Sequence, residues 1–369
     1  MSSAADTESG GRLGNINWNA LLVEGRALVA LALIIIVFSV LSDKFLEPDN
    51  FIIRSRHVAV NAIVSIGMLM TILHGGIDLS VGSIVGLTGI VAGYLLNGFD
   101  LPLSEMVAYP AVWVVVLSAL AVGSFVGLLN GLLVSRLHIA PFIATLGMLY
   151  AARGFALLIS NGLTFTSLNG SAALGNSGFL TVFRARALGI PAPVWVMIVF
   201  AIIFSVLLNR TPFGRWLYAV GGNERAAELS GVPVARVKTW VYVLSGFCAA
   251  TVGLLLAADL TAATPRSGEL YELNAIGAVV IGGAALSGGR GTIRGTLIGA
   301  FVIGFLVDGL VLVGVSVFWQ QVIKGVVIIL AVALDQVQQM IARKRAADRA
   351  ARPPSGPAAP TPVKEVVGT

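Results

Sequence analysis

The chain has 369 residues, of which 24 are basic and 18 are acidic, so its formal net charge is +6. It is 57% hydrophobic and only 11% charged, with a mean hydropathy of +0.91, whereas soluble domains carry about 25% charged residues. This composition excludes the two soluble domains that the length alone would allow and predicts an all-α polytopic membrane protein. The single cysteine, Cys248, excludes an intrachain disulfide and a cysteine metal cluster, and we expect no metal site.

Ten apolar segments have, or approach, the length needed to cross a bilayer. They are residues 27–41, 51–73, 83–96, 111–134, 141–160, 194–208, 237–257, 274–286, 296–314 and 318–334. The first has no small-residue cleavage site after it, so we interpret it as a retained span rather than a signal peptide. The eighth is short enough to be partly re-entrant.

The distribution of basic residues tests this count, because cytoplasmic loops of membrane proteins are enriched in Lys and Arg. With the amino terminus inside, 16 of the 24 basic residues fall in cytoplasmic segments. The pattern predicts about ten transmembrane helices with both termini cytoplasmic. Loops that face anionic lipid then explain the net charge, and no nucleic-acid partner is expected.

The chain divides into three predicted regions. Residues 1–25 are a mostly disordered cytoplasmic segment, and residues 26–335 form the transmembrane domain, with a large cytoplasmic loop at 209–238. Residues 336–369 are a basic, Pro/Ala-rich cytoplasmic tail that we expect to be disordered. The longest outer loop, 161–193, is predicted to hold a short surface helix.

A glycine-rich turn with one carboxylate follows the second span. Its main residues are Gly75, Gly76, Asp78, Ser80 and Gly82. A carboxylate in hydrocarbon costs about 2–3 kcal/mol unless the protein solvates it. The topology places this turn on the cytoplasmic side, so we expect an interfacial or helix-capping carboxylate and a hinge near an inner gate. A second span broken at mid-membrane would reverse that interpretation.

A second glycine-rich turn, residues 282–295, has small residues at the same internal spacing as the first. It lacks the Gly-Lys-Ser/Thr ending of a phosphate-binding loop, because no lysine of the chain follows a glycine. We therefore expect no ATP site here. The shared spacing suggests that two turns on the same membrane side have related roles, as internal repeats do in transporters.

The cytoplasmic loop contains the pattern of a complete short helix. Asn223 suits its N-cap, Glu224 its first turn, and Gly231 its end. A helix of two turns is not stable alone in water, so it either meets a partner surface or packs on the bundle. The residues of this predicted helix are Asn223, Glu224, Arg225, Ala226, Ala227, Leu229, Ser230 and Gly231.

Charged residues inside the spans require partners. Asp308 and Lys324 lie at similar depth, about 9–10 Å from the outer ends of the last two spans. We predict a structural ion pair between them rather than a proton relay, which would support transport with ATP withheld. Arg153 lies in the fifth span, where it either faces a polar cavity or extends outward.

Several motifs, in this order along the chain, carry a family resemblance. They are residues 75–83 (GGIDLSVGS), 141–147 (PFIATLG), 211–215 (TPFGR), 221–231 (GGNERAAELSG) and 272–283 (ELNAIGAVVIGG). Over about residues 48–335 the chain resembles the permease subunits of bacterial sugar ABC importers, in the ribose, xylose and arabinose branch of the branched-chain amino-acid and sugar permease family.

This resemblance implies a multi-pass protein of the bacterial inner membrane that is not itself an enzyme. A second permease copy would complete a homodimer, and a periplasmic binding protein would deliver a monosaccharide or sugar alcohol. A separate cytoplasmic ABC ATPase, often with two fused nucleotide-binding halves, would hold ATP and Mg²⁺, so no cofactor is expected on this chain. The resemblance identifies residues 223–232 as the helix that couples to the ATPase.

Two further residue sets follow from the resemblance. Charged residues of the outer loops are expected to dock the binding protein, unless they are simply solvated: Arg54, Arg56, Arg266, Glu269 and Glu272. Uncharged polar residues within spans are expected to line the sugar path, unless they bond across helices: Asn61, Asn130, Thr145 and Asn274.

Two alternative functions stay open at this point. A branched-chain amino-acid permease differs in its ligand, and a proton-coupled secondary sugar transporter would need no ATPase. The sequence does not distinguish between pentoses, hexoses and sugar alcohols.

Overall fold

The computed structural model describes residues 18–100 and 106–350, and these residues are mostly helical. The helices are α1 (Trp18–Leu41), α2 (Pro48–Leu73), α3 (Val81–Asn97), α4 (Val112–Ser135), α5 (Pro141–Ser160), α6 (Phe179–Phe183), α7 (Ala192–Arg210), α8 (Pro212–Gly222), α9 (Glu224–Leu229), α10 (Val234–Leu260), α11 (Tyr271–Ile281), α12 (Ile293–Leu312) and α13 (Val317–Ala350). Two 3₁₀ helices, η1 (Asp43–Leu46) and η2 (Ala172–Leu174), join them.

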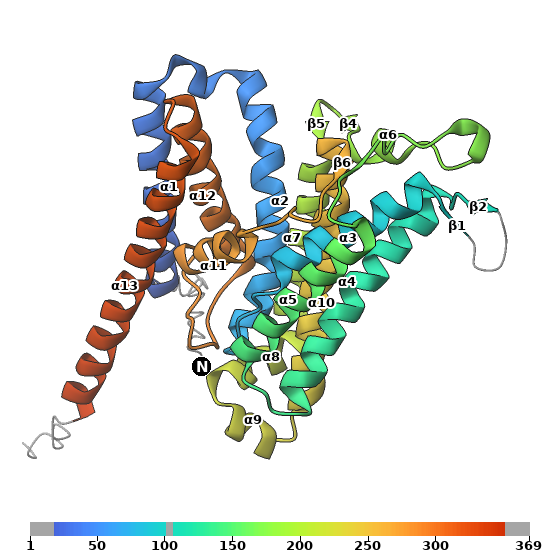
Figure 1. The fold of residues 1–369 in the computed structure, drawn as a ribbon. Coiled ribbons are helices and arrows are strands. Elements are labelled where there is room, and N and C mark those ends of the chain that lie inside the picture. The colour runs from blue at the N-terminus through green and yellow to red at the C-terminus, as the bar shows by residue number, and fades with distance from the viewer. Residues whose placement is uncertain (1–17, 101–105, 351–369) are drawn as a thin grey trace, which may run out of the picture.

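Three antiparallel pairs of two-residue strands lie in the connections. They are β1 (Phe99–Asp100) with β2 (Val107–Ala108), β3 (Phe165–Thr166) with β6 (Ala262–Ala263), and β4 (Arg186–Ala187) with β5 (Ile190–Pro191). The pair β3–β6 links two loops that are far apart in sequence. Figure 1 shows α8 and α9 at one end of the molecule, here called the α9 end, and α6 at the other, here called the α6 end.

Seven helices of the described chain are long and apolar enough to cross a membrane. They are α2, α4, α5, α7, α10, α12 and the part of α13 up to Leu334. Three shorter apolar helices are α3, α11 and the Ala27–Leu41 part of α1. Each of the ten predicted apolar segments therefore overlaps one helix. Helix α11 ends earlier than predicted, at Ile281, because the chain turns at Gly282 and Gly283.

The helices α2 and α10 form the centre of the bundle. Within their most apolar stretches 83% and 78% of the residues are buried, against 6% for α13. Close approach of α10 to α4 depends on glycines, because a Cβ on Gly127 would collide with the Tyr242 carbonyl and one on Gly246 with the Gly123 carbonyl. Small residues permit such contact where lipid provides no hydrophobic drive for association.

The ends of the chain differ from the predicted regions. Helix α1 begins at Trp18 and α13 continues to Ala350, so the inner parts of the segments predicted to be disordered are helical. Residues 1–17 and 351–369 lie outside the described residues. The outer loop 161–193 contains α6, which confirms the short surface helix, together with η2 and three strands.

We predict that Gly127→Ala destabilises the protein, because its Cβ has no room against α10. The cost should be about 1–3 kcal/mol, as for other overpacked contacts, and should lower the midpoint of thermal unfolding in detergent. Gly147→Ala on α5 is the matched control, since a Cβ there meets nothing within 4 Å. Equal midpoints for the two variants would contradict the glycine-dependent packing of α4 on α10.

Candidate functional site

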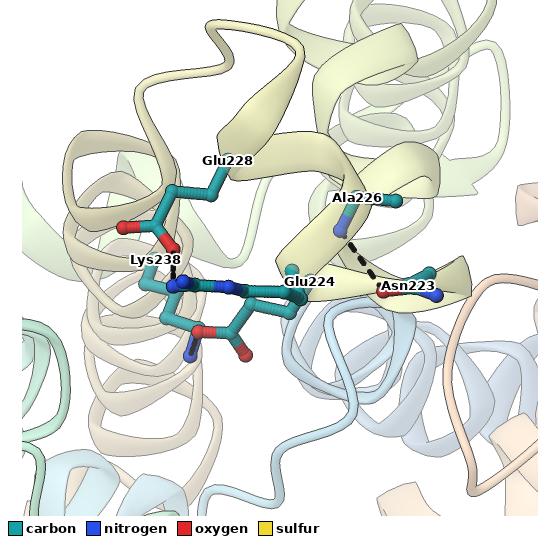
Figure 2. A network of polar contacts seen from close by, with 6 residues as sticks. Asn223, Glu224, Ala226, Glu228 and Lys238 are labelled. Atoms are coloured by element: carbon teal, nitrogen blue, oxygen red, sulfur yellow. Dashed lines mark hydrogen bonds and ion pairs between the residues drawn. The ribbon is translucent and has the colours of Figure 1, made fainter.

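The short helix at the α9 end has the capping chemistry that the sequence predicts. Asn223 is extended, with φ −158°, and its side-chain oxygen accepts a hydrogen bond of 3.0 Å from the Ala226 amide. Helix α9 then covers Glu224–Leu229, and Gly231 leaves it with φ +83°. Figure 2 shows this cap and the ion pairs around it. The predicted helix and its N-cap are confirmed.

One ion pair joins α9 to α10, a second lies within α9, and one large apolar side chain of α9 is exposed. Glu224 binds Lys238 of α10 at 2.7 Å, whereas Arg225 binds Glu228 within α9 at 3.0 Å. Ala227 packs inward, but Leu229 is 78% exposed. The helix is therefore fastened to the first turns of α10 while it presents a leucine away from the chain.

Asp78, in the first glycine-rich turn, is completely buried. Its carboxylate accepts hydrogen bonds from the Ser80 amide at 3.0 Å, the Ser80 hydroxyl at 2.6 Å and the Ser245 hydroxyl at 2.9 Å. Ser245 lies about 16 Å along α10 from Val234, at 1.5 Å per residue. Asp78 is therefore enclosed by protein rather than exposed at a surface, and its bond to the Ser80 amide matches the helix-capping alternative at the start of α3.

The cause of this burial is a re-entrant turn and not a broken second span. Helix α2 is continuous to Leu73, and the chain then turns back into the bundle before α3 begins at Val81. His74 starts the turn, and its ring packs against Tyr242 with centroids 5.4 Å apart. Burial, assisted by the charge of Lys238, lowers the pKa of His74 to about 3, so its imidazole is neutral.

Two of the residues predicted to line a path instead hold this turn in place. The Asn130 amide donates to the Ser80 hydroxyl at 2.8 Å, and the Thr145 hydroxyl lies 2.8 Å from the Pro141 carbonyl of its own helix and 3.1 Å from the Ile77 carbonyl of the turn. Both side chains are fully buried. These bonds match the cross-helix alternative. Asn61, which is 9% exposed, and the half-buried Asn274 make no comparable bond, and their place in a path stays a prediction.

Helices α3 and α11 begin against each other in the middle of the bundle. A Cβ on Gly82 would collide with the Gly268 carbonyl and the Glu272 carboxylate. From this contact α11 runs about 16 Å to the loop that continues toward the α9 end, and α3 runs about 22 Å toward β1, at 1.5 Å per residue. The segment 264–270 therefore lies at mid-depth, between two half-length helices.

Arg153 of α5 fastens this segment. Its guanidinium donates to the Pro265 carbonyl, to the Ser267 carbonyl at 3.1 Å and to the Gly82 carbonyl at 3.4 Å. Of the two alternatives for Arg153, the structure supports a polar surrounding inside the protein. The Pro265 and Ser267 carbonyls belong to the irregular segment before α11, where no helix satisfies them, whereas Gly82 lies in the first turn of α3.

The charged residues predicted for outer docking lie elsewhere. Arg266 and Glu269 are exposed and Glu272 is half-buried, but all three belong to the mid-depth segment or to the first turn of α11. The chain turns inward after β6, and a role of these residues in docking stays a prediction. Their exposure at this depth is unusual, since a charge facing hydrocarbon costs about 2.5–3.5 kcal/mol.

The remaining two docking candidates, Arg54 and Arg56, contact other residues of the chain. Arg54 is 4% exposed, donates to the Phe45 carbonyl and lies 4.3 Å from the centroid of the Phe45 ring. Arg56 pairs with Asp259 at 2.8 Å and joins α2 to α10. Arg54 is buried although its Nη2 atom has no hydrogen-bond partner among the described residues, and Arg56 is engaged by Asp259.

The expected ion pair between Asp308 and Lys324 is absent from the described residues. Asp308 faces α2 and lies 3.7 Å from the His57 Nδ1 atom, whereas Lys324 makes no ion pair within 4.0 Å. Depth alone suggested the pair, but the rotation of α12 about its axis turns Asp308 toward α2. No group of three or more His, Cys, Asp or Glu that could hold a metal ion occurs in the part of the chain that the structure describes.

Comparisons with known proteins agree with this architecture. Residues 54–332 match the family described as the permease component of the branched-chain amino acid transport system. The chain belongs to this permease family. Within the family, its relatives are permeases of sugar importers. No solved structure matches the chain.

Three relatives show the level of similarity. The ribose import permease protein of Bacillus subtilis (strain 168) is 44% identical over 87% of this chain and 95% of that protein. The ribose import permease protein of Escherichia coli (strain K12) is 41% identical over 90% of this chain and 99% of that protein. The L-arabinose transport system permease protein of the same strain is 32% identical over 93% of this chain and 99% of that protein. This chain is the permease subunit of a sugar ABC importer.

We predict that a thiol at position 269 of this permease is accessible to water. Glu269→Cys should react with a hydrophilic maleimide in membranes, because a charged side chain exposed at mid-depth requires a polar surrounding. Phe155→Cys is the control, since Phe155 is 60% exposed on α5 close to Arg153 but apolar. Native Cys248 is buried and should give no background. Labelling of Phe155→Cys as fast as Glu269→Cys would contradict the prediction.

Proposed function

We propose that this permease imports an aldopentose and that ribose is its substrate. The observation that carries this proposal is the 44% and 41% identity to two ribose import permeases over nearly their whole length, against 32% for an arabinose permease. A sugar is uncharged and hydroxyl-rich, so a path with polar side chains and exposed backbone groups suits it. The half-buried Asn274 and the exposed Glu269 and Arg266 provide such groups at mid-depth.

The proposed topology has ten transmembrane helices and lies in the bacterial inner membrane. Seven long helices and three shorter apolar ones supply the count. The α9 end is cytoplasmic in this proposal, because basic residues gather in and around α8 and α9. These are Arg210, Arg215, Arg225, Arg236 and Lys238. Both termini then lie on the cytoplasmic side, in accordance with positive-inside topology.

Helix α9 is the proposed contact with the ATPase. It has exposed Leu229 at its end and is held to α10 by the Glu224–Lys238 pair. A two-turn helix with a free leucine gains most from a complementary groove. The proposed assembly has two permease copies, an ATPase with two fused nucleotide-binding halves that holds ATP and Mg²⁺, and a periplasmic sugar-binding protein at the α6 end. No cofactor is assigned to this chain.

The substrate proposal is tested in proteoliposomes that contain the permease, its ATPase and the cognate binding protein. Labelled ribose should accumulate only with ATP, and unlabelled ribose should compete better than arabinose, xylose or leucine. Preferential competition by leucine would support an amino-acid permease instead. Ribose uptake without ATP that is abolished by a protonophore would support a proton-coupled transporter.

Replacement of Leu229 tests the ATPase contact. Leu229→Ser should weaken ATPase binding about tenfold or more, because a leucine buried at an interface contributes about 1.5–3 kcal/mol. Membrane insertion should be unchanged, since Leu229 packs on nothing that stabilises the bundle. Leu188→Ser is the matched control, because Leu188 is 90% exposed between β4 and β5 at the α6 end. Undiminished ATPase binding by Leu229→Ser would remove α9 as the contact.

A further inference from the structure

Three segments that are remote in sequence meet by their backbones at the α9 end. They are the end of α2 with its turn, the end of α8, and the loop between α11 and α12. We call this contact the glycine junction and define it by Leu73, Gly75, Gly221, Gly288 and Gly289. The Gly289 amide donates to the Leu73 carbonyl at 2.9 Å, which joins the first segment to the third.

The glycine junction has no space for side chains. A Cβ on Gly221 would collide with the Leu73 carbonyl, and one on Gly288 would lie 2.9 Å from the Gly221 carbonyl and 3.0 Å from the Gly75 amide nitrogen. Gly75, Gly288 and Gly289 also have φ of +87°, +88° and +72°, which favour glycine. Packed backbones without flexible side chains between them transmit displacement, because close-packed interiors are poorly compressible.

A half-buried tyrosine strengthens the contact between α8 and the third segment. Tyr218 lies one turn before the end of α8, and its hydroxyl donates to the Gly291 carbonyl at 2.8 Å. Burial raises the pKa of Tyr218, so the hydroxyl keeps the proton that it donates. The end of α8 is therefore held to this loop at two places, Tyr218 and Gly221.

Each of the three segments is connected along the chain to different helices of the permease. Helix α8 continues through Asn223 into α9. The first turn continues through Asp78 into α3, and the third segment connects α11 to α12. Helices α3 and α11 are the two half-length helices that meet at mid-depth beside Gly82. The glycine junction is thus the place where α9 is connected to both of them.

We propose that the glycine junction is the positioning element that transfers movement of α9 to α3 and α11, so that ATP hydrolysis opens the mid-depth segment to sugar. This inference rests on the proposed contact of α9 with the ATPase. The residues of the junction touch neither sugar nor nucleotide in this scheme. They act through the helices that they connect.

The glycine junction could only stabilise the fold, or it could also transfer movement from α9. These two roles differ in how a defect at the junction changes the amount of sugar transported per ATP. A structural defect lowers the amount of folded permease and leaves the sugar transported per ATP unchanged. A transfer defect leaves the complex assembled but reduces that ratio. The coupling ratio is therefore the deciding readout.

Two adjacent glycines provide a matched pair of variants. Gly221→Ala places a methyl group inside the junction, whereas Gly222→Ala places it where nothing lies within 4 Å. Both changes favour the helical conformation of α8 equally. With the full complex in proteoliposomes, ribose uptake and ATP hydrolysis are measured together. Gly221→Ala should bind the ATPase normally and lower sugar per ATP several-fold, because its methyl group displaces the Leu73 and Gly289 backbones that carry the movement, and Gly222→Ala should match the wild type.

The inference is overturned if Gly221→Ala keeps the wild-type ratio, or if Gly222→Ala loses coupling to the same extent. Should Gly221→Ala fail to insert, Tyr218→Phe decides, because it adds no atoms. Its ratio should fall about fivefold for one lost hydrogen bond, and an unchanged ratio would overturn the inference. Failure of the proposed function is seen separately, since the wild-type complex would then show no ATP-dependent ribose uptake.

Discussion

The structure depends on how irregular backbone is satisfied inside an apolar bundle. Helices α3 and α11 both begin at mid-depth, so their flanking segments lack the hydrogen bonds of a continuous helix, and hydrocarbon offers no substitute. Arg153 satisfies the segment before α11 by donating to the Pro265 and Ser267 carbonyls. Asp78 satisfies the segment before α3 by accepting a hydrogen bond from the Ser80 amide. These two residues therefore stabilise the non-helical segments from which α11 and α3 begin, which gives both a reason to lie in the bundle.

Helix α10 links the parts of the permease that act at different depths. Lys238 near its start holds α9, Ser245 further along holds Asp78, and Asp259 near its end holds Arg56 of α2. Glycines of α4 allow it to lie against that helix without intervening side chains. A single helix therefore contacts α9, the buried turn and α2.

Local chemistry explains what could be predicted from the sequence. Apolar length located ten helices, and capping by Asn223 located α9, because both depend on neighbouring residues. The positions of Glu269 and Glu272 could not be predicted, since they depend on the inward turn after β6 and on Arg153 from α5. Asp308 was assigned the wrong partner because depth does not determine rotation about a helix axis. Asp78 was placed at the interface because α2 does end there, while the return of the chain into the bundle rests on contacts with α10.

The last helix is longer than a bilayer requires. Helix α13 has 34 residues, so it measures about 51 Å, whereas the hydrocarbon core is about 30 Å thick. Figure 1 shows it extending toward the α9 end well past α1 and α12. About 20 Å of α13 is therefore in excess of the hydrocarbon thickness. The end of α13 therefore projects from the bilayer on the same side of the molecule as α9.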